Sequence, residues 1–148
     1  MLLVVHHTTS PTLQALLDAA LSGTRAEGLE AVEVRVRPAL AATVTDVLEA
    51  DGFLLGTPAN IGYMSGALKV FFDSVYYPTL TAKVGAPYGL YVHGNNDTVG
   101  AVRAVESIAK GMSWQKVQEA VSVVGSPSKA DSEEIWNLAA TVAATLLA

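Results

Sequence analysis

The chain alternates short apolar runs with segments in which apolar residues recur at helical spacing. The runs predict strands at residues 2–5, 32–36, 53–55, 88–92 and 117–123. The helical segments cover residues 13–21, 68–75, 102–108 and 135–146, with a weaker one over residues 43–49. Strands that alternate with helices in this way are typical of a parallel sheet covered on both faces. The pattern therefore predicts one α/β domain, residues 1–148, folded as a three-layer sandwich.

Ligands of such sheets bind at the loops that follow the carboxyl ends of the strands. In a five-stranded sheet of order 2-1-3-4-5, the loops after the first and third strands meet at the switch point. These loops are "HHTTSPT" and "GTPANIGYM", and a third loop, "HGNNDTVG", follows the fourth strand. We expect a ligand site where they meet.

The first loop is rich in hydroxyl groups just before a helix. It contains Thr8, Thr9, Ser10 and Thr12. Together with the free amides of a helix N-terminus, these side chains would wrap an anion such as a phosphate. The alternative is an ordinary helix cap that uses Ser10 or Thr12 alone, with Pro11 at the first helical position. Capping needs one hydroxyl, so the presence of four favours the phosphate.

The second loop suits a flat heterocycle. Gly56, Pro58 and Gly62 bend the backbone so that successive amides can point at an electron-rich ring. Asn60 adds a side-chain donor and acceptor, and Tyr63 offers a broad face. The alternative is an ordinary turn from a strand into a helix.

The third loop carries polar side chains whose role stays open at this point. Asn95, Asn96 and Asp97 either contact the pyrimidine edge of a bound ring or cap the helix that follows. His93 is the candidate for a proton relay or for a contact with a substrate, and a loop histidine without a chemical role is the alternative.

Composition narrows the remaining classes of function. The chain has no cysteine, which excludes disulfides, cysteine-ligated metals and a thiol nucleophile, and permits a cytoplasmic location. The net charge of -5, without any basic run, argues against nucleic-acid binding. No apolar run approaches the ~20 residues of a membrane span. The 51% hydrophobic content therefore belongs to a core or to a subunit interface, such as that of a homodimer.

Residues 56–74, "GTPANIGYMSGALKVFFDS", carry a specific family pattern. They resemble the segment G-T/S-P-x-x-x-G-x-M-S/A-G-x-L-K-x-F-x-D of the flavodoxin-like FMN oxidoreductases, which include the NADPH-dependent FMN reductases and the WrbA-type quinone reductases. The agreeing positions are Gly56, Pro58, Gly62, Met64, Gly66, Lys69, Phe71 and Asp73. The resemblance implies a flavodoxin-like fold for nearly the whole chain, with sharp motifs only in about its first half.

Carried over by position, the resemblance implies an FMN site. We expect no metal, because His6 and His7 are adjacent and successive side chains of a strand point to opposite faces. The residues implied at the phosphate are Thr8, Thr9, Ser10, Thr12 and Leu13. The residues implied around the isoalloxazine ring are Pro58, Ala59, Asn60, Ile61, Gly62, Tyr63, Met64, His93, Gly94, Asn95, Asn96 and Asp97. The phosphate loop departs from the flavodoxin pattern at Pro11, which has no amide proton, and at Leu13, which has no hydroxyl. We therefore expect weaker phosphate binding than in flavodoxins.

The resemblance also implies an activity. The expected function is an oxidoreductase that transfers electrons from NAD(P)H through FMN to a quinone or another small acceptor. The rival from a different class is a flavodoxin-type electron carrier without a substrate of its own, which the length of 148 residues fits. A third hypothesis keeps the fold as a binding module without flavin. The reductase-like motif and the modest charge favour the enzyme over the carrier.

Overall fold

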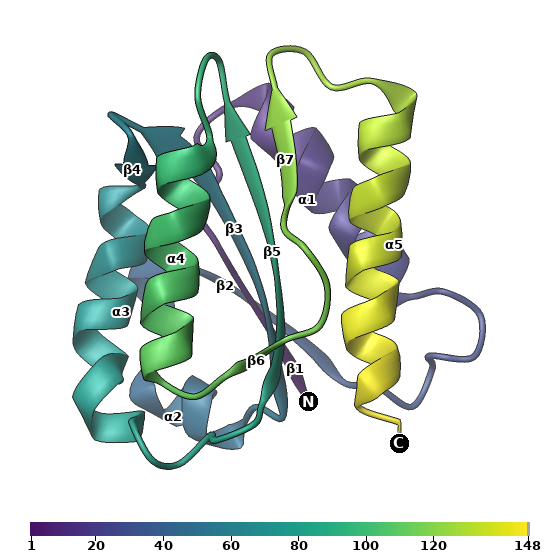
Figure 1. Cartoon of the computed structure of the whole chain (residues 1–148). Coiled ribbons are helices and arrows are strands. Elements are labelled where there is room, and N and C mark those ends of the chain that lie inside the picture. Colours follow the sequence, from purple (N-terminus) through teal and green to yellow (C-terminus); the bar gives the residue numbers. More distant parts are fainter. Residues whose placement is uncertain (148) are drawn as a thin grey trace.

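The first strand lies inside a mainly parallel sheet because its side chains are apolar on both faces. Leu2, Leu3, Val4 and Val5 are fully buried, as the residues of an interior parallel strand are. This strand, β1 (Leu2–His6), pairs in parallel with β2 (Val34–Pro38) on one side and with β3 (Gly52–Asn60) on the other. The computed structural model describes residues 1–147, and Figure 1 shows the sheet between two layers of helices.

The remaining elements complete this arrangement. The other strands are β4 (Tyr63–Met64), β5 (Pro87–Gly94), β6 (Gln115–Lys116) and β7 (Val121–Val124). The helices are α1 (Pro11–Thr24), the short 3-10 helix η1 (Ala39–Ala41), α2 (Val44–Glu49), α3 (Gly66–Thr79), α4 (Val99–Gly111) and α5 (Lys129–Thr145). The sheet order is β2-β1-β3-β5-β6, with β7 pairing in parallel with β5 and β4 pairing antiparallel with β3.

Two apolar clusters hold the helices to the sheet. On one face, α1 and α5 pack against the sheet through residues such as Leu16, Ala20 and Leu138. The backbones of α1 and α5 touch at Gly23, where an added Cβ would lie 2.2 Å from the carbonyl oxygen of Trp136. On the other face α2, α3 and α4 bury a second cluster. Figure 1 shows α3 and α4 side by side to the left of the sheet, with α5 to its right and α1 farther back on the side of α5.

The predicted fold class is confirmed, with differences in detail. The expected order 2-1-3-4-5 is present as β2, β1, β3, β5 and a last position that β6 and β7 share. The single strand predicted at residues 117–123 is confirmed only for residues 121–123, because β6 ends at Lys116 and β7 begins at Val121. The sequence also missed the antiparallel strand β4, so residues 56–64 form most of a hairpin rather than an open loop.

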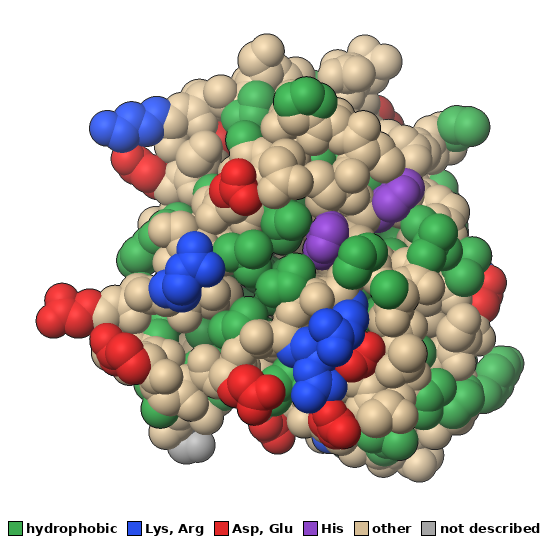
Figure 2. Space-filling view, turned by 180° about the vertical axis from the view of Figure 1, so that it is seen from behind, with side chains coloured by type: hydrophobic (Ala, Val, Ile, Leu, Met, Phe, Trp, Pro, Cys, Tyr) green, Lys and Arg blue, Asp and Glu red, His purple; other side chains and the backbone are tan. Residues whose placement is uncertain are grey.

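The second strand lies two residues later than the pattern predicted. Val32 belongs to the preceding turn, where its amide donates to the carbonyl oxygen of Leu29 at 3.0 Å. β2 is an edge strand, so its residues are only partly covered. Val34 and Val36 line a cavity on this side, and Figure 2 shows hydrophobic side chains gathered in a hollow of the face seen from behind. Half-exposed strands blur the apolar signal, which explains the shift.

Gly56 has no side chain, which leaves room for a large aromatic ring over the middle of the sheet. Gly56 on β3 pairs with Tyr91 on β5, and the Tyr91 ring lies directly over the glycine. A Cβ at Gly56 would lie 2.1 Å from the ring carbon that carries the hydroxyl. Tyr91 is 1% exposed, so the ring has no open space into which it could move.

We expect the substitution Gly56→Ala to destabilise the protein by about 1–3 kcal/mol, the usual cost of overpacking a core. Urea unfolding followed by circular dichroism measures this change. The control is Gly66→Ala at the start of α3, where an added Cβ meets no atom within 4 Å. The control should leave stability unchanged or raise it by about 0.4–1 kcal/mol. Equal stability of the two variants would contradict the assigned role of Gly56.

Candidate functional site

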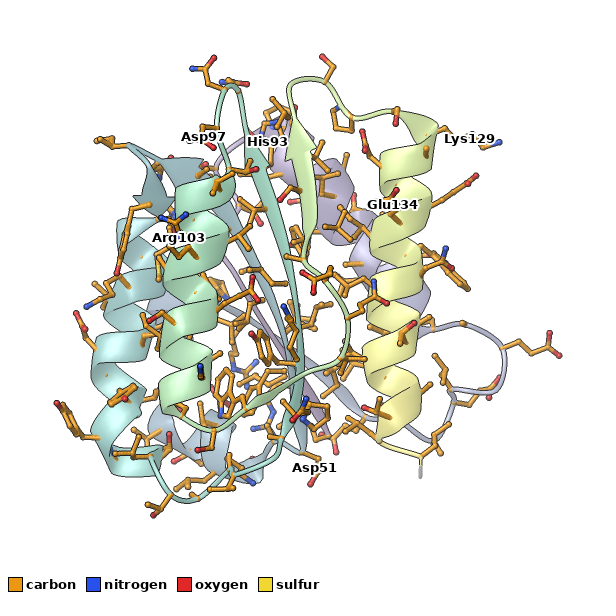
Figure 3. The ribbon with its side chains drawn as sticks, viewed as in Figure 1. Asp51, His93, Asp97, Arg103, Lys129 and Glu134 are labelled. Carbon is orange, nitrogen blue, oxygen red and sulfur yellow. The ribbon has the colours of Figure 1, made fainter. Side chains whose placement is uncertain are left out.

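The three loops singled out by the sequence meet at one cavity beyond the carboxyl ends of β1, β3 and β5. The cavity has a volume of about 320 Å³, near the lower limit for a small-molecule site. Its lining consists of Thr9, Ser10, Thr12, Leu13, Pro58, Ala59, Asn60, His93, Gly94 and Asn95. Figure 3 shows His93 at the end of β5 and Asp97 at the same end of the sheet. The strand order thus brings distant segments together as expected.

The β1–α1 loop combines a helix cap with hydroxyls that remain available. Ser10 is the N-cap of α1, and its Oγ accepts from the amide of Leu13 at 3.1 Å. The Leu13 amide is therefore already used, while the Ser10 hydroxyl proton is still free to donate. Thr9 and Thr12 line the cavity without a side-chain bond to another described residue. The loop can hold an anion through these hydroxyls and the positive end of a helix of 14 residues.

Thr8 lies beside the cavity rather than in its lining. Its Oγ1 is 2.8 Å from Nδ1 of His6. Burial lowers the pKa of His6 below its usual value of 6.5, and the neighbouring His7 lowers it further. The neutral ring is therefore favoured in the folded protein.

The β3–β4 hairpin forms the second wall of the cavity. Ile61 and Gly62 occupy its turn with φ values of +49° and +71°. Positive φ at both central positions is the geometry of tight hairpin turns, in which asparagine and glycine are usual. A β-branched residue costs about 1–2 kcal/mol in this conformation. Ile61 is also fully exposed, so packing does not offset this cost.

Two contacts fix the hairpin in place. The Thr57 hydroxyl, which is fully buried, donates to the Pro58 carbonyl at 2.8 Å and accepts from the Ser65 amide at 3.1 Å. At the other end, an added Cβ at Gly100 would lie 2.0 Å from the carbonyl oxygen of Gly62, so the hairpin tip rests on the first turn of α4. The sequence pattern did not reveal the role of either Thr57 or Gly100.

The β5–α4 loop is tied to a segment that sequence reasoning missed. His93 Nε2 is 2.8 Å from the carbonyl oxygen of Gly125, and the Gly125 amide donates to the Gly94 carbonyl at 2.9 Å. A carbonyl oxygen only accepts, so Nε2 carries a proton, and Nδ1 of the neutral ring is left as an acceptor. Gly125 lies beyond β7, 32 residues away in sequence. In the sequence only the glycine itself indicates this turn, and in the structure its φ is +75°.

Several predicted site residues lie outside the lining of the cavity. Asp97 accepts from the amide of Val99 at 2.9 Å, which is the capping role weighed for it. Met64 is 2% exposed and belongs to the core cluster under α3 and α4. The predicted residues outside the lining are Thr8, Ile61, Gly62, Tyr63, Met64, Asn96 and Asp97. Their contact with a ligand stays a prediction.

The lining lacks charged side chains. Of the residues that border the cavity, His93 alone is titratable, and the described lining contains no lysine, arginine or carboxylate. Within residues 1–147, no group of three or more histidine, aspartate or glutamate side chains could hold a metal ion. The site can therefore bind a ligand through hydroxyls, amides and a helix terminus, with uncharged walls on either side.

The lowered pKa of His6 gives a prediction for stability. Between the lowered pKa and 6.5 the unfolded chain binds more protons than the folded protein, so stability falls as the pH drops through this window. Urea unfolding at pH 7.5 and 5.5 measures the loss, and carboxylates titrate mainly below this range. We expect the loss to be smaller in His6→Asn. An identical loss in both proteins would show that His6 does not contribute.

Comparison with known proteins shows that the chain matches a family model over most of its length. The model of the family described as NADPH-dependent FMN reductase matches residues 29–129. A protein named flavodoxin from Aquifex aeolicus (strain VF5) is 38% identical over 73 residues. That match covers 49% of this chain and 38% of the relative, so the relative is much longer than the shared segment.

Solved structures of low sequence identity share the fold. A flavodoxin from the domain Archaea superposes with a TM-score of 0.83 at 16% identity, over 99% of both chains. A flavodoxin, WrbA-like protein from Agrobacterium tumefaciens gives 0.78 at 17% identity, over 97% of this chain and 95% of the other. Rubredoxin oxygen:oxidoreductase from Desulfovibrio gigas gives 0.82 at 15% identity, but this chain spans only 36% of it. The fold is flavodoxin-like. None of the helices in residues 1–147 is long and apolar enough to span a membrane.

Proposed function

Because this chain belongs to the NADPH-dependent FMN reductase family, we propose that it binds FMN and transfers electrons from NAD(P)H to a quinone or another small acceptor. The observation that carries the proposal is the meeting of the hydroxyl loop, the hairpin and the His93 loop around one cavity. This cavity lies at the switch point of the sheet, where doubly wound folds bind their ligands.

The residues present suit the two ends of FMN. At the phosphate end, the hydroxyls of Thr9, Ser10 and Thr12 would donate to the oxygens, with the N-terminus of α1 behind them. At the ring end, Asn60 and Asn95 provide amide groups on opposite walls of the cavity. Burial of the phosphate without a cation is acceptable because hydrogen bonds to a charged group contribute about 1.5–3 kcal/mol each.

The protein supplies binding, orientation and charge stabilisation, and bound FMN supplies the hydride chemistry. The hairpin is held at both ends, by Thr57 at its base and by Gly100 at its tip. Its backbone dipoles are therefore held in fixed positions, and with FMN bound they would stabilise charge that develops on the ring. Nδ1 of His93, the ring nitrogen not bonded to Gly125, is the atom through which His93 would accept a proton.

A second candidate is a flavodoxin-type electron carrier without a substrate of its own. The relative from Aquifex aeolicus is named a flavodoxin, and so are several proteins of the same fold. Both functions need the same cofactor and the same cavity. They differ in whether a pyridine nucleotide can deliver electrons directly to the bound flavin.

We expect the FMN-loaded protein to lose its flavin absorbance under NADPH or NADH without oxygen, and to regain it when a quinone is added. Absorbance spectroscopy in an anaerobic cuvette measures both steps, with free FMN at the same concentration as the control. Bleaching by dithionite alone, with neither nucleotide effective, would favour the electron carrier. A protein that stays colourless after reconstitution and desalting would contradict FMN binding itself.

The phosphate loop gives a separate prediction for affinity. FMN should bind more tightly than riboflavin by at least ~2 kcal/mol, or about 30-fold. The double substitution Thr9→Val and Thr12→Val removes two hydroxyls and keeps the Ser10 cap. It should abolish most of this preference and leave riboflavin affinity nearly unchanged, as fluorescence titration measures. Thr45→Val, on an exposed face of α2, is the matched control. Retention of the full preference by the double variant would show that the hydroxyls of Thr9 and Thr12 do not hold the phosphate.

A further inference from the structure

A second, larger cavity runs along α4 on its side toward β7. It has a volume of about 620 Å³. We call it the α4 groove, and it is lined by Thr98, Val99, Val102, Arg103, Glu106, Ser107, Lys110 and Ser122. All but the first and last of these residues lie on α4, at the spacing of one helix face. From Val99 to Lys110 the groove extends about 16 Å at 1.5 Å per residue.

The α4 groove carries positive charge in an acidic protein. Within residues 1–147, neither Arg103 nor Lys110 makes an ion pair, although both line the groove. The carboxylate of Glu106 pairs with Lys116 at 2.8 Å, and Lys116 also pairs with Glu119 at 3.1 Å. The lining itself therefore holds two cations and one carboxylate. The net charge of the chain is -5, so the excess of cations in this lining is opposite in sign to the charge of the whole chain. Such a groove attracts a ligand with more than one phosphate.

The walls of the groove are suited to an aromatic base as well as to phosphate. Val99 and Val102 form an apolar wall, and Val99 is 58% exposed. Ser107 and Ser122 add hydroxyls that can donate to a ribose or a phosphate. Apolar walls with a few polar groups that fix orientation are the usual composition of a nucleotide site.

The α4 groove lies next to the cavity formed by the three loops, which we call the flavin cavity because FMN is proposed to bind there. The two cavities lie on either side of the β5–α4 loop, since Asn95 lines the first and Thr98 lines the second. Figure 3 shows Arg103 on α4, below Asp97 in this view, so the cation lies in the half of the helix nearest to the loop. The tip of the hairpin rests on Gly100, which fixes the upper end of α4 relative to the flavin cavity. A dinucleotide that occupies both cavities would therefore cross this loop.

We propose that the α4 groove binds the adenosine half of NADPH, with Arg103 and Lys110 contacting its phosphates and Val99 and Val102 contacting the adenine. Arg103 holds the 2′-phosphate, because the guanidinium matches phosphate geometry better than an ammonium does. The groove thus makes the protein prefer NADPH over NADH. This inference rests on the proposed function, since the nicotinamide half must reach a flavin in the neighbouring cavity.

Binding of adenosine 2′,5′-bisphosphate to the FMN-loaded protein tests the groove without any turnover. Isothermal titration calorimetry should give a dissociation constant that Arg103→Gln raises by about tenfold or more. Adenosine 5′-monophosphate, which lacks the 2′-phosphate, should lose much less affinity. Arg25→Gln is the matched control, because Arg25 is also exposed and makes no ion pair within residues 1–147 but lies far from α4 at the end of α1. Circular dichroism confirms that both variants fold.

Steady-state kinetics tests nucleotide binding in the groove separately from the proposed reductase function. If the protein reduces quinone, Arg103→Gln should raise KM for NADPH about tenfold, with kcat and the KM for NADH nearly unchanged. Unchanged nucleotide preference and unchanged bisphosphate binding in this variant would contradict nucleotide binding in the α4 groove. The proposed reductase function would not be affected by that result. Bisphosphate binding that depends on Arg103, in a protein that neither nucleotide reduces, would support the groove and refute the function. A wild-type protein that does not bind the bisphosphate would refute the groove.

Discussion

The parallel pairing of β1 with β3 is the interaction on which the candidate site depends. It places His6 opposite Gly56, and one further hydrogen bond joins the His7 amide to the Gly56 carbonyl at 3.0 Å. The two loops that follow these strands therefore begin at the same level of the sheet. A shift of the register by one residue would turn every buried side chain of β1 to the opposite face. Leu2 and Val4 belong to one apolar cluster and Leu3 and Val5 to the other, so such a shift would disrupt the packing on both faces of the sheet.

The strongest predictions from sequence were those supported by complete burial or by helical periodicity. β1 and β5 were predicted because their residues are apolar on both faces, and α1 was predicted from its buried stripe. The cavity was predicted from strand order, because carboxyl ends of parallel strands meet at one edge. The hairpin was missed because its turn has Ile61 where asparagine is usual. The bond between His93 and Gly125 joins residues too distant in sequence for any local pattern to indicate.

Charge is distributed so that the two cavities differ in how they bind anions. The cavity formed by the three loops has hydroxyls and a helix terminus but no cation among its described lining residues, so an anion bound there would be held by hydrogen bonds that salt screens little. The α4 groove has exposed cations, whose attraction weakens as ionic strength rises. Hydrogen bonds from uncharged groups suit a cofactor that stays bound. Exposed cations suit a ligand that must leave after each turnover.

The contact of α1 with α5 at Gly23 determines when the N-terminal part of the protein can fold during synthesis. The apolar face of α1, including Leu16 and Ala20, is covered by α5, which begins only at Lys129. While the chain emerges from the ribosome, the loop of Thr9 and Thr12 exists early but the helix behind it has no support. Domains fold as units once their sequence is available. A nascent chain should therefore fold the loop before α1 into its final conformation only when its last helix has been synthesised.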